Sequence, residues 1–496
     1  MALLQGWVAI EPQADRTLNG LSLDSREVQD GDLFLACRGL TVDGAEFIDA
    51  AIERGAAAVL WQPHPGAQAL PLTYRSAPGG QHVPVVAMAD LKSQVGFIAH
   101  RFYGQPSAAM FTVGITGTNG KTSVSQFLAD CLNQDAPAGV IGTLGHGLYG
   151  ALEPSNHTTP DAVLVHRWLA QMREQGAASV AMEVSSHALD QGRIHGVELD
   201  CGVFTNLSRD HLDYHGDMTH YGEAKRSLFA QPGMRYAVMN GDDAQLVELL
   251  RDLPASLQVW RYGLQPGADY QVRGEQLKLS RHGINLQVVT PAGRGQLKSP
   301  LLGCFNASNL LAVLSVLLLH GIALETALMR LSNVPPVAGR METFGGESQP
   351  LVVVDYAHTP DALQQVLQAV RDHVAAEAKL ICVFGCGGDR DQGKRALMGA
   401  IAEQFADRVI LTNDNPRDEN AHDIIQDIQE GIKNPDAVYL QRDRRAAIAD
   451  AIRHAGAQDI VVIAGKGHER WQLIAGQKLP FSDAAEVQQQ LGAWSS

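Results

Sequence analysis

The sequence predicts an α/β protein of three domains: a mixed α/β N-terminal domain, a central domain with a mostly parallel sheet, and a C-terminal domain of alternating strands and helices. Three observations support this prediction. The chain has 496 residues, which is room for three domains at about 100 to 200 residues each. A glycine-rich loop joins a strand-like run to a helical run near residue 120. Short β-branched runs alternate with helical runs over the last third of the chain.

Two clusters of proline and glycine indicate the domain boundaries. Residues 103–107 precede a strand-like run, and residues 334–339 follow an apolar helical stretch predicted over 309–331. The N-terminal part contains two strand candidates, GDLFLACRG and AAAVLW. The predicted domains are residues 1–104, 105–337 and 338–496.

The last segment predicts βαβ units and a mostly parallel, Rossmann-like sheet. Its strand-like runs are LVVVDYAH, LICVFG, RVILTND and DIVVIAG, and its helical runs are 360–375, 394–406, 421–432 and 444–455. Ligands of such sheets bind beyond the carboxyl ends of the strands. The polar residues that follow these runs should therefore lie along one edge: Asp355, Arg390, Asp414 to Arg417, and Lys466 to Glu469.

Composition argues against two classes of partner. The formal net charge of −15 opposes sequence-independent binding to nucleic acid, which depends on Lys and Arg at phosphates. The longest apolar run, 310–319, is shorter than the roughly 18 to 20 residues of a membrane span. Residues 1–16 lack the pattern of a secretory signal, and the six cysteines are scattered. We therefore expect a cytoplasmic protein with neither nucleic-acid partners nor membrane insertion.

The run GITGTNGKTS, residues 114–123, predicts a P-loop that holds the phosphates of ATP. A strand-like run precedes it and a helical run follows it. Glycines let backbone N–H groups approach phosphate oxygens, Lys121 supplies positive charge, and Thr122 can ligate Mg²⁺. Five residues separate Gly114 from Gly120, one more than in the strict Walker pattern. The alternative is an ordinary glycine-rich turn, which does not explain the flanking strand and helix.

Three further residues are candidates for catalysis or metal binding. Glu183 ends a small and apolar run, where a carboxylate suits Mg²⁺, and the alternative is a solvent-facing residue at a strand end. His211 follows the strand-like run GVFTNL and could hold a second metal, although a lone histidine is more often structural. Lys225, considered alone, predicts a solvated helical lysine.

Seven motifs occur in one order along the chain: TGTNGKT, MEVSSHAL, FTNLSRDHLDYHG, EAKRSLF, GCFNASNLLA, GRME and DYAHTPD. In this order they resemble the Mur ligase family over essentially the full length. The irregular glycine spacing of the P-loop resembles that family's usual loop. The resemblance implies a cytoplasmic, ATP-dependent ligase that adds one amino acid to the peptide stem of the cell-wall precursor.

The resemblance also implies how ATP and metal are bound. Thr122 and Glu183 would hold one Mg²⁺, and His211 and a carbamylated Lys225 a second. The residues implied in catalysis are Lys121, Glu183, His211, Lys225 and Arg340. Those implied in ATP binding are Thr116, Gly117, Thr118, Asn119, Gly120, Lys121, Thr122, Asn306, Asn309, Arg340 and Asp355.

Two groups of residues match the family's site for a UDP-linked substrate. They are Leu23, Ser25, Leu40, Thr41 and Val42 near the N-terminus, and Thr158, Thr159, Ser185, Gln191 and Arg193 in the central domain. One departure is visible, because His157 precedes the two threonines where the family often has Asn-Thr-Thr.

The motif Asp414-Asn415-Pro416-Arg417 implies meso-2,6-diaminopimelate as the added amino acid, since lysine-adding relatives lack its arginine. Arg390 and Arg417 would pair with the distal carboxylate, which lysine does not have. The amino end would be received by Asp414, Asn415, Gly465 and Glu469. The alternative for this motif alone is a polar turn.

The implied reaction forms an acyl phosphate on the γ-carboxylate of D-glutamate in UDP-N-acetylmuramoyl-L-alanyl-D-glutamate, which the amine of diaminopimelate attacks. Because Arg340 and Asp355 lie in another predicted domain than the P-loop, we expect a hinge near Pro335 and Pro336. Three alternatives remain: a lysine-adding relative, folylpolyglutamate synthase, and a non-catalytic ATP-dependent regulator that binds cell-wall precursors.

Overall fold

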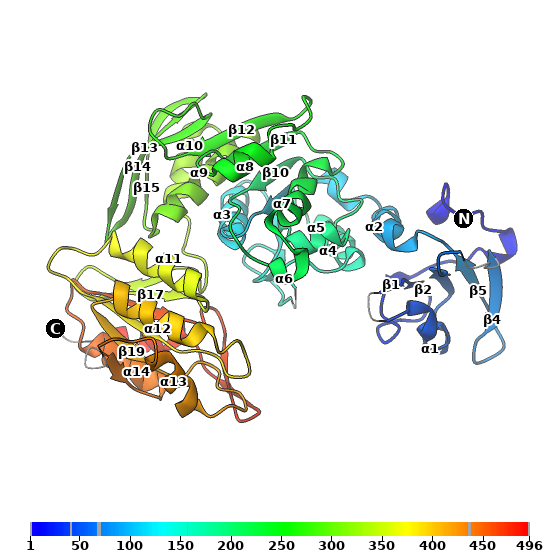
Figure 1. Ribbon diagram of the computed structural model, residues 1–496. Helices are drawn as coiled ribbons and strands as arrows, with labels where there is room; N and C mark the ends of the chain where they lie inside the picture. The colour runs from blue at the N-terminus through cyan, green and yellow to red at the C-terminus, as the bar shows by residue number, and fades with distance from the viewer. Residues whose placement is uncertain (1, 40–41, 67–70, 156, 435–437, 495–496) are drawn as a thin grey trace. The chain divides into compact units, whose positions relative to one another are not determined.

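The computed structural model describes residues 2–39, 42–66, 71–155, 157–434 and 438–494 (Figure 1). The chain forms two compact units, Met1–Trp260 and Arg261–Ser496. None of the helices in the described ranges is long and apolar enough to cross a membrane. Short 3₁₀ helices occur at Ala2–Leu4, Pro12–Ala14, Gly44–Phe47, Pro106–Ala109 and Ser227–Ala230.

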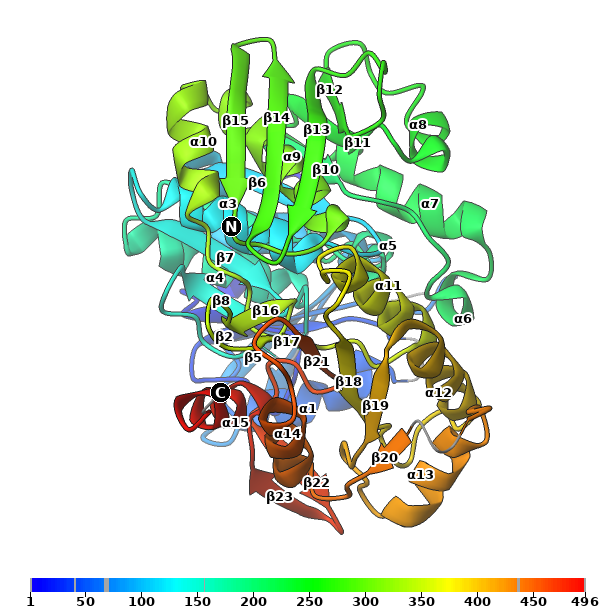
Figure 2. The ribbon, with the colours of Figure 1, turned by 90° about the vertical axis from the view of Figure 1, so that its left-hand side faces the viewer.

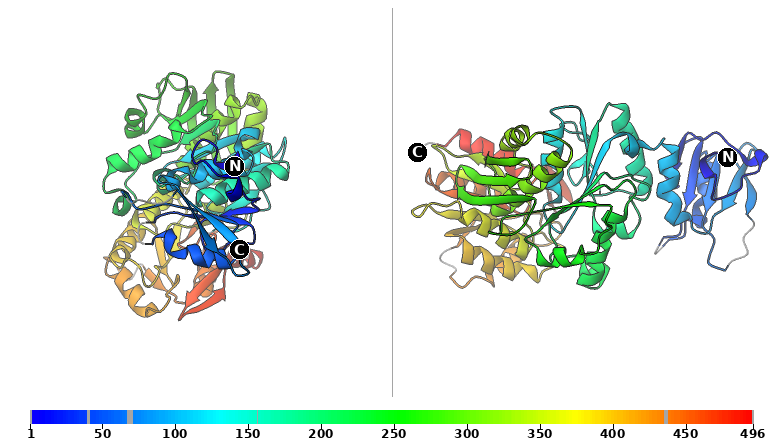
Figure 3. Two further views of the ribbon diagram at one scale, coloured as in Figure 1. Left: turned by 90° about the vertical axis from the view of Figure 1, so that its right-hand side faces the viewer. Right: turned by 90° about the horizontal axis from the view of Figure 1, so that it is seen from above.

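The first unit begins with a five-stranded sheet, drawn in blue in Figure 3. Its strands in spatial order are β1 (Gly20–Ser22), β2 (Asp32–Ala36), β3 (Ala58–Trp61), β5 (His82–Ala87) and β4 (Leu72–Ser76). Strand β4 pairs antiparallel and the others pair in parallel. The helices are α1 (Ile48–Glu53) and α2 (Leu91–Phe102). The two predicted strands are therefore confirmed, as β2 and β3.

The rest of the first unit is built on parallel strands. In spatial order they are β11 (Tyr236–Asn240), β10 (Cys201–Phe204), β6 (Phe111–Thr116), β9 (Ser179–Glu183) and β7 (Ala138–Gly142), with β8 (Gly145–Leu148) antiparallel to β7. The helices are α3 (Lys121–Leu132), α4 (Ala162–Glu174), α5 (Ser186–Asp190), α6 (Leu212–His215), α7 (Met218–Arg226) and α8 (Ala244–Leu249). Strands β6 and β9 place Ile115 beside Glu183. The predicted P-loop and the candidate carboxylate therefore leave the sheet at the same edge.

The second unit begins with antiparallel strands, shown side by side in Figure 2. They are β13 (Val272–Ser280), β14 (Gly283–Thr290) and β15 (Gly293–Ser299), preceded by β12 (Gln258–Gly263), which spans the boundary between the units. Two helices follow, α9 (Cys304–Leu319) and α10 (Leu324–Ser332).

The helical stretch predicted over 309–331 consists of two helices, because α9 ends before α10 begins. Gly321 has φ of 93°, the left-handed conformation that commonly ends a helix. Its N–H donates to Leu318 O, and the N–H of Ile322 donates to Leu317 O. Apolar residues flank His320 and Gly321 on both sides, so the sequence pattern did not separate the two helices.

The second unit ends in a six-stranded sheet. In spatial order its strands are β16 (Glu342–Gly345), β17 (Leu351–Asp355), β21 (Ile460–Ala464), β18 (Leu380–Phe384), β19 (Arg408–Leu411) and β20 (Val438–Leu440). Only β16 among them pairs antiparallel. The remaining elements are α11 (Pro360–Arg371), α12 (Lys394–Phe405), α13 (Ala421–Gln429), α14 (Arg444–Arg453), α15 (Asp483–Gly492) and the hairpin of β22 (Trp471–Ile474) and β23 (Gln477–Pro480). The predicted alternation of strands and helices is confirmed.

Both faces of this last sheet are buried. Along β17, Leu351 and Val353 belong to one hydrophobic core, and Val352 and Val354 belong to another. Because side chains alternate between the faces of a strand, the two cores lie on opposite faces of the sheet. Burial on both faces explains why these strands are continuous apolar runs in the sequence. The loops beyond the strands are thus left to carry the polar residues.

Candidate functional site

The predicted P-loop joins β6 to α3. Gly117 and Gly120 have φ of 145° and 86°, which side-chain-bearing residues rarely adopt. The backbone N–H of Thr118 donates to Asn206 O, and that of Asn119 donates to Asn206 Oδ1, each at 2.9 Å. The first N–H groups of α3 have no acceptor within the helix, so this end of the loop suits an anion.

Lys121 lies across the P-loop. Its Nζ donates to Gly117 O at 2.7 Å and to Thr118 O at 2.9 Å. The hydroxyls of Thr118 and Tyr221 share a hydrogen bond of 3.2 Å. The loop therefore holds a positive charge beside its glycine, as phosphate binding requires.

Glu183 is buried beside the P-loop with its oxygens surrounded by hydroxyl and amide groups. Thr122 Oγ1 donates to Glu183 Oε2 at 3.0 Å, and Thr143 Oγ1 donates to the same oxygen at 3.1 Å. Thr143 N–H donates to Oε1 at 2.9 Å. Burial raises the pKa of Glu183, and these hydrogen bonds and Lys121 only partly oppose that effect. A solvent-facing position for Glu183 is excluded, since its exposed fraction is 0%.

The predicted substrate residues of the central domain lie next to Glu183. Thr158 and Thr143 share a hydroxyl hydrogen bond of 3.1 Å. Thr159 Oγ1 donates to Glu183 O at 2.9 Å and accepts from Ser185 N–H. Arg193 Nη1 donates to Thr159 O at 2.8 Å. The structure thus brings these predicted residues together in one network.

The remaining substrate residues have fewer contacts with this network. Gln191 Oε1 accepts from the Nε and Nη2 atoms of Arg193. Near the N-terminus, Leu23 and Ser25 follow β1, and Val42 is 52% exposed. The predicted residues Leu40 and Thr41 lie outside the described residues, as does Asn156 before His157.

Lys225 is not the solvated lysine that its helical pattern alone suggested. Its Nζ donates to Gly117 O at 2.8 Å and lies 4.6 Å from the centre of the Tyr221 ring. Burial, and then Lys121 nearby, lower the pKa of Lys225 well below its usual value. The structure therefore places a buried lysine amine, with a lowered pKa, against the carbonyl of the P-loop glycine.

His211 is the predicted partner of Lys225 at a second metal. It has φ of 52°, its Nε2 lies 3.5 Å from Asp210 Oδ2, and its side chain is half exposed. Its ring lies 4.9 Å from that of His187 and 6.2 Å from that of Tyr221. Both His211 and Lys225 therefore contact Tyr221. The described residues contain no group of three or more His, Cys, Asp or Glu arranged to hold a metal.

Sequence reasoning missed several residues of this site, chiefly Thr143, Asn206 and Tyr221. Thr143 directly follows β7 and Asn206 lies just after β10. The rule that ligands bind beyond parallel strands could have found both. Tyr221 lies four residues before Lys225 and therefore on the same face of α7.

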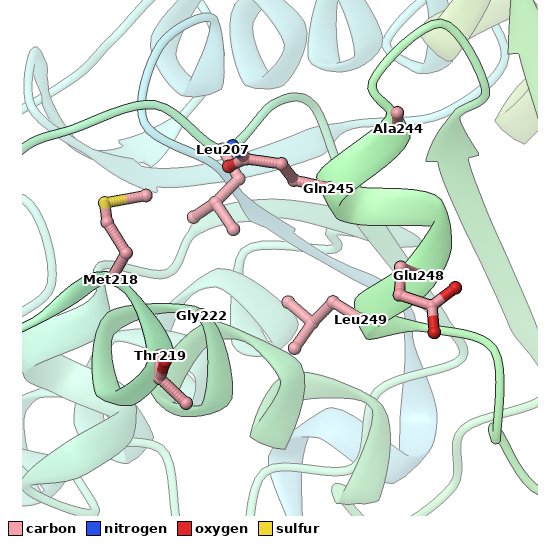
Figure 4. A pocket seen from close by; sticks show the side chains of 8 residues that line it. All are labelled: Leu207, Met218, Thr219, Gly222, Ala244, Gln245, Glu248 and Leu249. Atoms are coloured by element: carbon pink, nitrogen blue, oxygen red, sulfur yellow. The ribbon is translucent and has the colours of Figure 1, made fainter.

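A cavity of about 550 Å³ lies near this site, between α7 and α8 (Figure 4). It is lined by Leu207, Met218, Thr219, Gly222, Ala244, Gln245, Glu248 and Leu249. None of the predicted site residues that the structure describes lines it.

The second unit carries the other residues predicted for ATP. Met341 N–H and Ala357 N–H each donate to Asp355 at 2.8 Å, and burial raises the pKa of this carboxyl group. Arg340 lies 5.1 Å from the centre of the Tyr356 ring. In α9, Asn306 Nδ2 donates to Leu302 O, and Asn309 Nδ2 donates to Asn306 Oδ1. Asp355 thus also holds the backbone next to Arg340.

The residues predicted to receive the amino end of the added amino acid lie beyond β19 and β21. Lys466, which is 0% exposed, donates from Nζ to Asn415 Oδ1 at 2.9 Å and to Glu469 Oε2 at 2.7 Å. Asn415 Nδ2 also donates to Glu469 Oε2. Within the described part of the chain, Glu469 Oε1 accepts no hydrogen bond. A Cβ on Gly465 would lie 2.6 Å from Asp414 Oδ2, so only glycine leaves room there.

The two predicted arginines both lie close to one glycine, Gly387. A Cβ on Gly387 would be 2.9 Å from Arg417 Nη1 and 3.8 Å from Arg390 Cγ. Arg417 Nη1 donates to Gly388 O at 2.5 Å, and Pro416 O lies against Gly388. Arg390 is exposed, and no group among the described residues pairs with its guanidinium. The structure therefore places both arginine side chains against Gly387, and their role as a carboxylate clamp stays a prediction.

The fold and the site define the class first. A parallel sheet with a phosphate loop at the end of an inner strand, and a buried carboxylate beside that loop, is an α/β enzyme that uses ATP.

Comparison with known proteins gives the family. Residues 17–103 match the model described as Mur ligase family, catalytic domain, residues 115–317 the Mur ligase middle domain, and residues 339–467 the Mur ligase glutamate ligase domain. The chain belongs to the Mur ligase family. The predicted α/β fold and three-domain architecture are confirmed, while the bounds 1–104, 105–337 and 338–496 stay predictions.

Individual relatives agree with this assignment. The chain is 48% identical over 485 residues to UDP-N-acetylmuramoyl-L-alanyl-D-glutamate--2,6-diaminopimelate ligase of Coxiella burnetii, with 96% of each chain covered. A solved structure of a ligase with that name has 36% identity and a TM-score of 0.73, covering 98% of this chain and 96% of that one. MurF ligase from Thermotoga maritima, solved in complex with ADP, shares the fold at 18% identity with a TM-score of 0.61, covering 92% and 96%.

Proposed function

We propose that this chain is an ATP-dependent ligase that adds meso-2,6-diaminopimelate to UDP-N-acetylmuramoyl-L-alanyl-D-glutamate. The new amide forms at the γ-carboxylate of D-glutamate, and ADP and phosphate are released. The relatives that share about half of its residues carry this activity in their names.

The observation that carries the choice of amino acid is that the side chains of Arg390 and Arg417 both lie against Gly387. The distal head of diaminopimelate has a carboxylate and an ammonium, whereas lysine has only the ammonium. A guanidinium binds a carboxylate through two parallel hydrogen bonds. Glu469 Oε1 and the carboxylate of Asp414 are acceptors for the ammonium. This charge pattern favours diaminopimelate over lysine.

The chemistry needs alignment and dispersal of charge rather than a protein nucleophile. The γ-carboxylate oxygen of D-glutamate attacks the γ-phosphorus of ATP, and the bond to the ADP oxygen breaks. The neutral amine of diaminopimelate then attacks the acyl phosphate carbon, phosphate leaves with the bonding electrons, and the amine loses a proton. Lys121 and Arg340 oppose the charge that develops on the transferred phosphoryl group.

The residues around Glu183 fit a bound Mg²⁺. A buried carboxylate and a threonine hydroxyl are hard oxygen ligands, and no cationic side chain among the described residues forms an ion pair with Glu183. Thr122 and Glu183 would hold one ion, and His211 and a carbamylated Lys225 a second. Bound Mg²⁺ supplies positive charge at the phosphate oxygens.

A carbamate on Lys225 is chemically consistent with its surroundings. Carbamates form when a neutral amine attacks CO₂ and releases a proton, and the lowered pKa of Lys225 makes that neutral form available. The product is an anion, which converts a lysine into an oxygen ligand.

The nucleotide part of the substrate is assigned to the N-terminal residues Leu23, Ser25 and Val42 and to the network of Thr158, Thr159, Ser185, Gln191 and Arg193. The adenosine of ATP is assigned to Asn306, Asn309 and Asp355. We place the reaction in the cytoplasm, where ATP and nucleotide-linked precursors are available. Free thiols at Cys37, Cys201, Cys382 and Cys386 are compatible with this reducing compartment.

A phosphate-release assay tests the proposal. The purified protein is given Mg-ATP and the dipeptide nucleotide, with meso-diaminopimelate, with L-lysine, or with neither. We expect sustained release only with diaminopimelate, together with a product of the corresponding mass. Equal release with lysine would contradict the choice of amino acid. Absence of release with every amino acid would instead favour a non-catalytic regulator.

A further inference from the structure

The two loops that carry the paired arginines have little regular structure of their own. Arg390 lies in the loop after β18 and Arg417 in the loop after β19, and these strands are parallel neighbours. Asp389 and Arg417 have φ of 53° and 55°, a conformation that non-glycine residues seldom adopt. Such conformations persist only where surrounding contacts hold them.

Direct contacts between the loops provide part of that support. Gly388 N–H donates to Asn415 O at 2.9 Å, and Asp418 N–H donates to Asp389 Oδ2 at 3.2 Å. The guanidinium of Arg417 donates to Gly388 O. These hydrogen bonds join the two loops directly.

A buried arginine underlies both loops. Arg395 of α12 is 0% exposed, and its Nη1 and Nη2 atoms each donate to Glu419 at 2.7 Å. Nη1 also donates to Asp427 of α13 at 2.7 Å, and Nη2 lies 3.4 Å from Gly387 O. Because the guanidinium of Arg395 and the carboxylate of Glu419 pair through two hydrogen bonds, both their relative orientation and their distance are fixed.

Glu419 differs from Asp427 in what else it contacts. Glu419 Oε2 accepts the backbone N–H of Asp389 at 2.9 Å, one residue before Arg390. Glu419 itself lies two residues after Arg417. Asp427 contacts Arg395 alone among the described residues. Two carboxylates thus pair with one arginine, but only Glu419 connects the two loops.

We propose that Glu419 is a positioning residue for amino-acid selection. By joining Arg395 to the backbone of Asp389, it keeps Arg390 and Arg417 directed at the same carboxylate of the incoming amino acid. This inference rests on the proposed function. Glu419 acts through the loops, because its oxygens are engaged by Arg395, Asp389 N–H and Gln392.

The test compares three variants of the full-length enzyme: Glu419→Gln, Glu419→Asp and Asp427→Asn. Glu419→Gln places an amide N–H where an acceptor is needed. Glu419→Asp keeps the charge beside Arg395 but shortens the reach to Asp389. Asp427→Asn is the matched control, since it removes a carboxylate from the same arginine without touching the loops. Each is measured for thermal unfolding, for KM of diaminopimelate and of ATP, and for kcat/KM with L-lysine.

We expect both Glu419 variants to raise KM for diaminopimelate by about tenfold, the size of one charge-assisted hydrogen bond lost at a binding site. KM for ATP and the residual rate with lysine should not change, because lysine lacks the carboxylate that the arginines bind. Asp427→Asn should keep KM for diaminopimelate within about twofold, because Asp427 pairs with Arg395 but forms no hydrogen bond with the described residues of the two loops.

Three results would overturn the inference. One is an unchanged KM for diaminopimelate in a folded Glu419 variant. Another is an equal rise in Asp427→Asn, which would make the network a general support of the fold. The third is a parallel rise in KM for ATP. Failure of the proposed function is distinguishable, because it appears in the unmodified enzyme as no preference for diaminopimelate over lysine.

Discussion

Thr122 donates a hydrogen bond of 3.0 Å to Glu183, although the two residues are 61 positions apart in the chain. Thr122 lies in the first turn of α3 and Glu183 ends β9, so the contact joins the P-loop helix to the neighbouring strand. It places the hydroxyl and the carboxylate where a cation could contact both. Burial of the Glu183 carboxylate destabilises the folded state, because burial disfavours its charged form.

Replacing Glu183 by glutamine should abolish most of the activity. It should nevertheless stabilise the metal-free protein against unfolding. Glutamine can still accept Thr143 N–H at Oε1 and can donate to the threonine hydroxyls, so no polar group is left unpaired. Removing a buried charge whose desolvation is only partly offset should raise the free energy of unfolding by about 1 to 2 kcal/mol at neutral pH. Thermal unfolding of both proteins in chelator measures this.

The pH dependence of that difference follows from the raised pKa of Glu183. Below the ordinary carboxyl value of 4.5, the folded and unfolded states are both protonated and Glu183 contributes nothing. As pH rises above 4.5, the unfolded state ionises first, so wild type loses stability relative to Glu183→Gln. A wild type that becomes more stable than the variant across this range would refute the argument.

Lys225 should bind CO₂ as a carbamate. With isotope-labelled bicarbonate, wild type should give a carbamate carbonyl signal in NMR, and activity should fall in buffer depleted of CO₂. The physical reason is the lowered pKa of the Lys225 amine, which burial and the nearby Lys121 cause and which favours the neutral form that reacts with CO₂. Lys225→Met should lose the signal, while Lys433→Met, which alters an exposed lysine, should keep it. A signal that survives in Lys225→Met would assign the carbamate elsewhere.

Adding a methyl group at Gly387 should weaken binding of diaminopimelate specifically. The new Cβ would lie 2.9 Å from Arg417 Nη1, and that flexible end must move. We expect KM for diaminopimelate to rise about tenfold, the effect of a lost charge-assisted hydrogen bond, with little change in thermal stability. Gly492→Ala is the control, since its Cβ meets nothing within 4 Å. Equal KM values in the two variants would show that Arg417 does not bind the substrate.

Much of the fold could be predicted because its strands are buried on both faces. Runs such as LVVVDYAH and DIVVIAG have no polar face, and each became an inner strand, β17 or β21. The P-loop could also be predicted, because its strand, its glycines and its helix are contiguous in the sequence. The break between α9 and α10 was not predicted, since apolar residues lie on both sides of His320 and Gly321.

The site could be predicted only in part, because it depends on contacts between segments that are distant in the sequence. Sequence pattern placed Glu183 at a strand end, but nothing in it indicates that Thr143 donates two hydrogen bonds to the carboxylate. Likewise, a lysine after a strand predicts a charge at the sheet edge, not a fully buried Nζ between Asn415 and Glu469. Such contacts depend on which loops the topology brings together.

That buried lysine leads to a last prediction, for Lys466→Met. Lys466 Nζ donates to Glu469 Oε2 and to Asn415 Oδ1, which leaves Glu469 Oε1 as the oxygen that we propose for the substrate ammonium. Methionine fills a similar volume but leaves a partly buried carboxylate without its cation. We expect a loss of stability of about 3 kcal/mol, the order seen when a buried ion pair loses one partner. KM for diaminopimelate should rise more than KM for ATP, because Glu469 and Asn415 lose their fixed orientation.

Lys433→Met controls for loss of an exposed positive charge. If Lys466→Met matched wild type in both unfolding and KM, the lysine would have no part in shaping the amino-acid site.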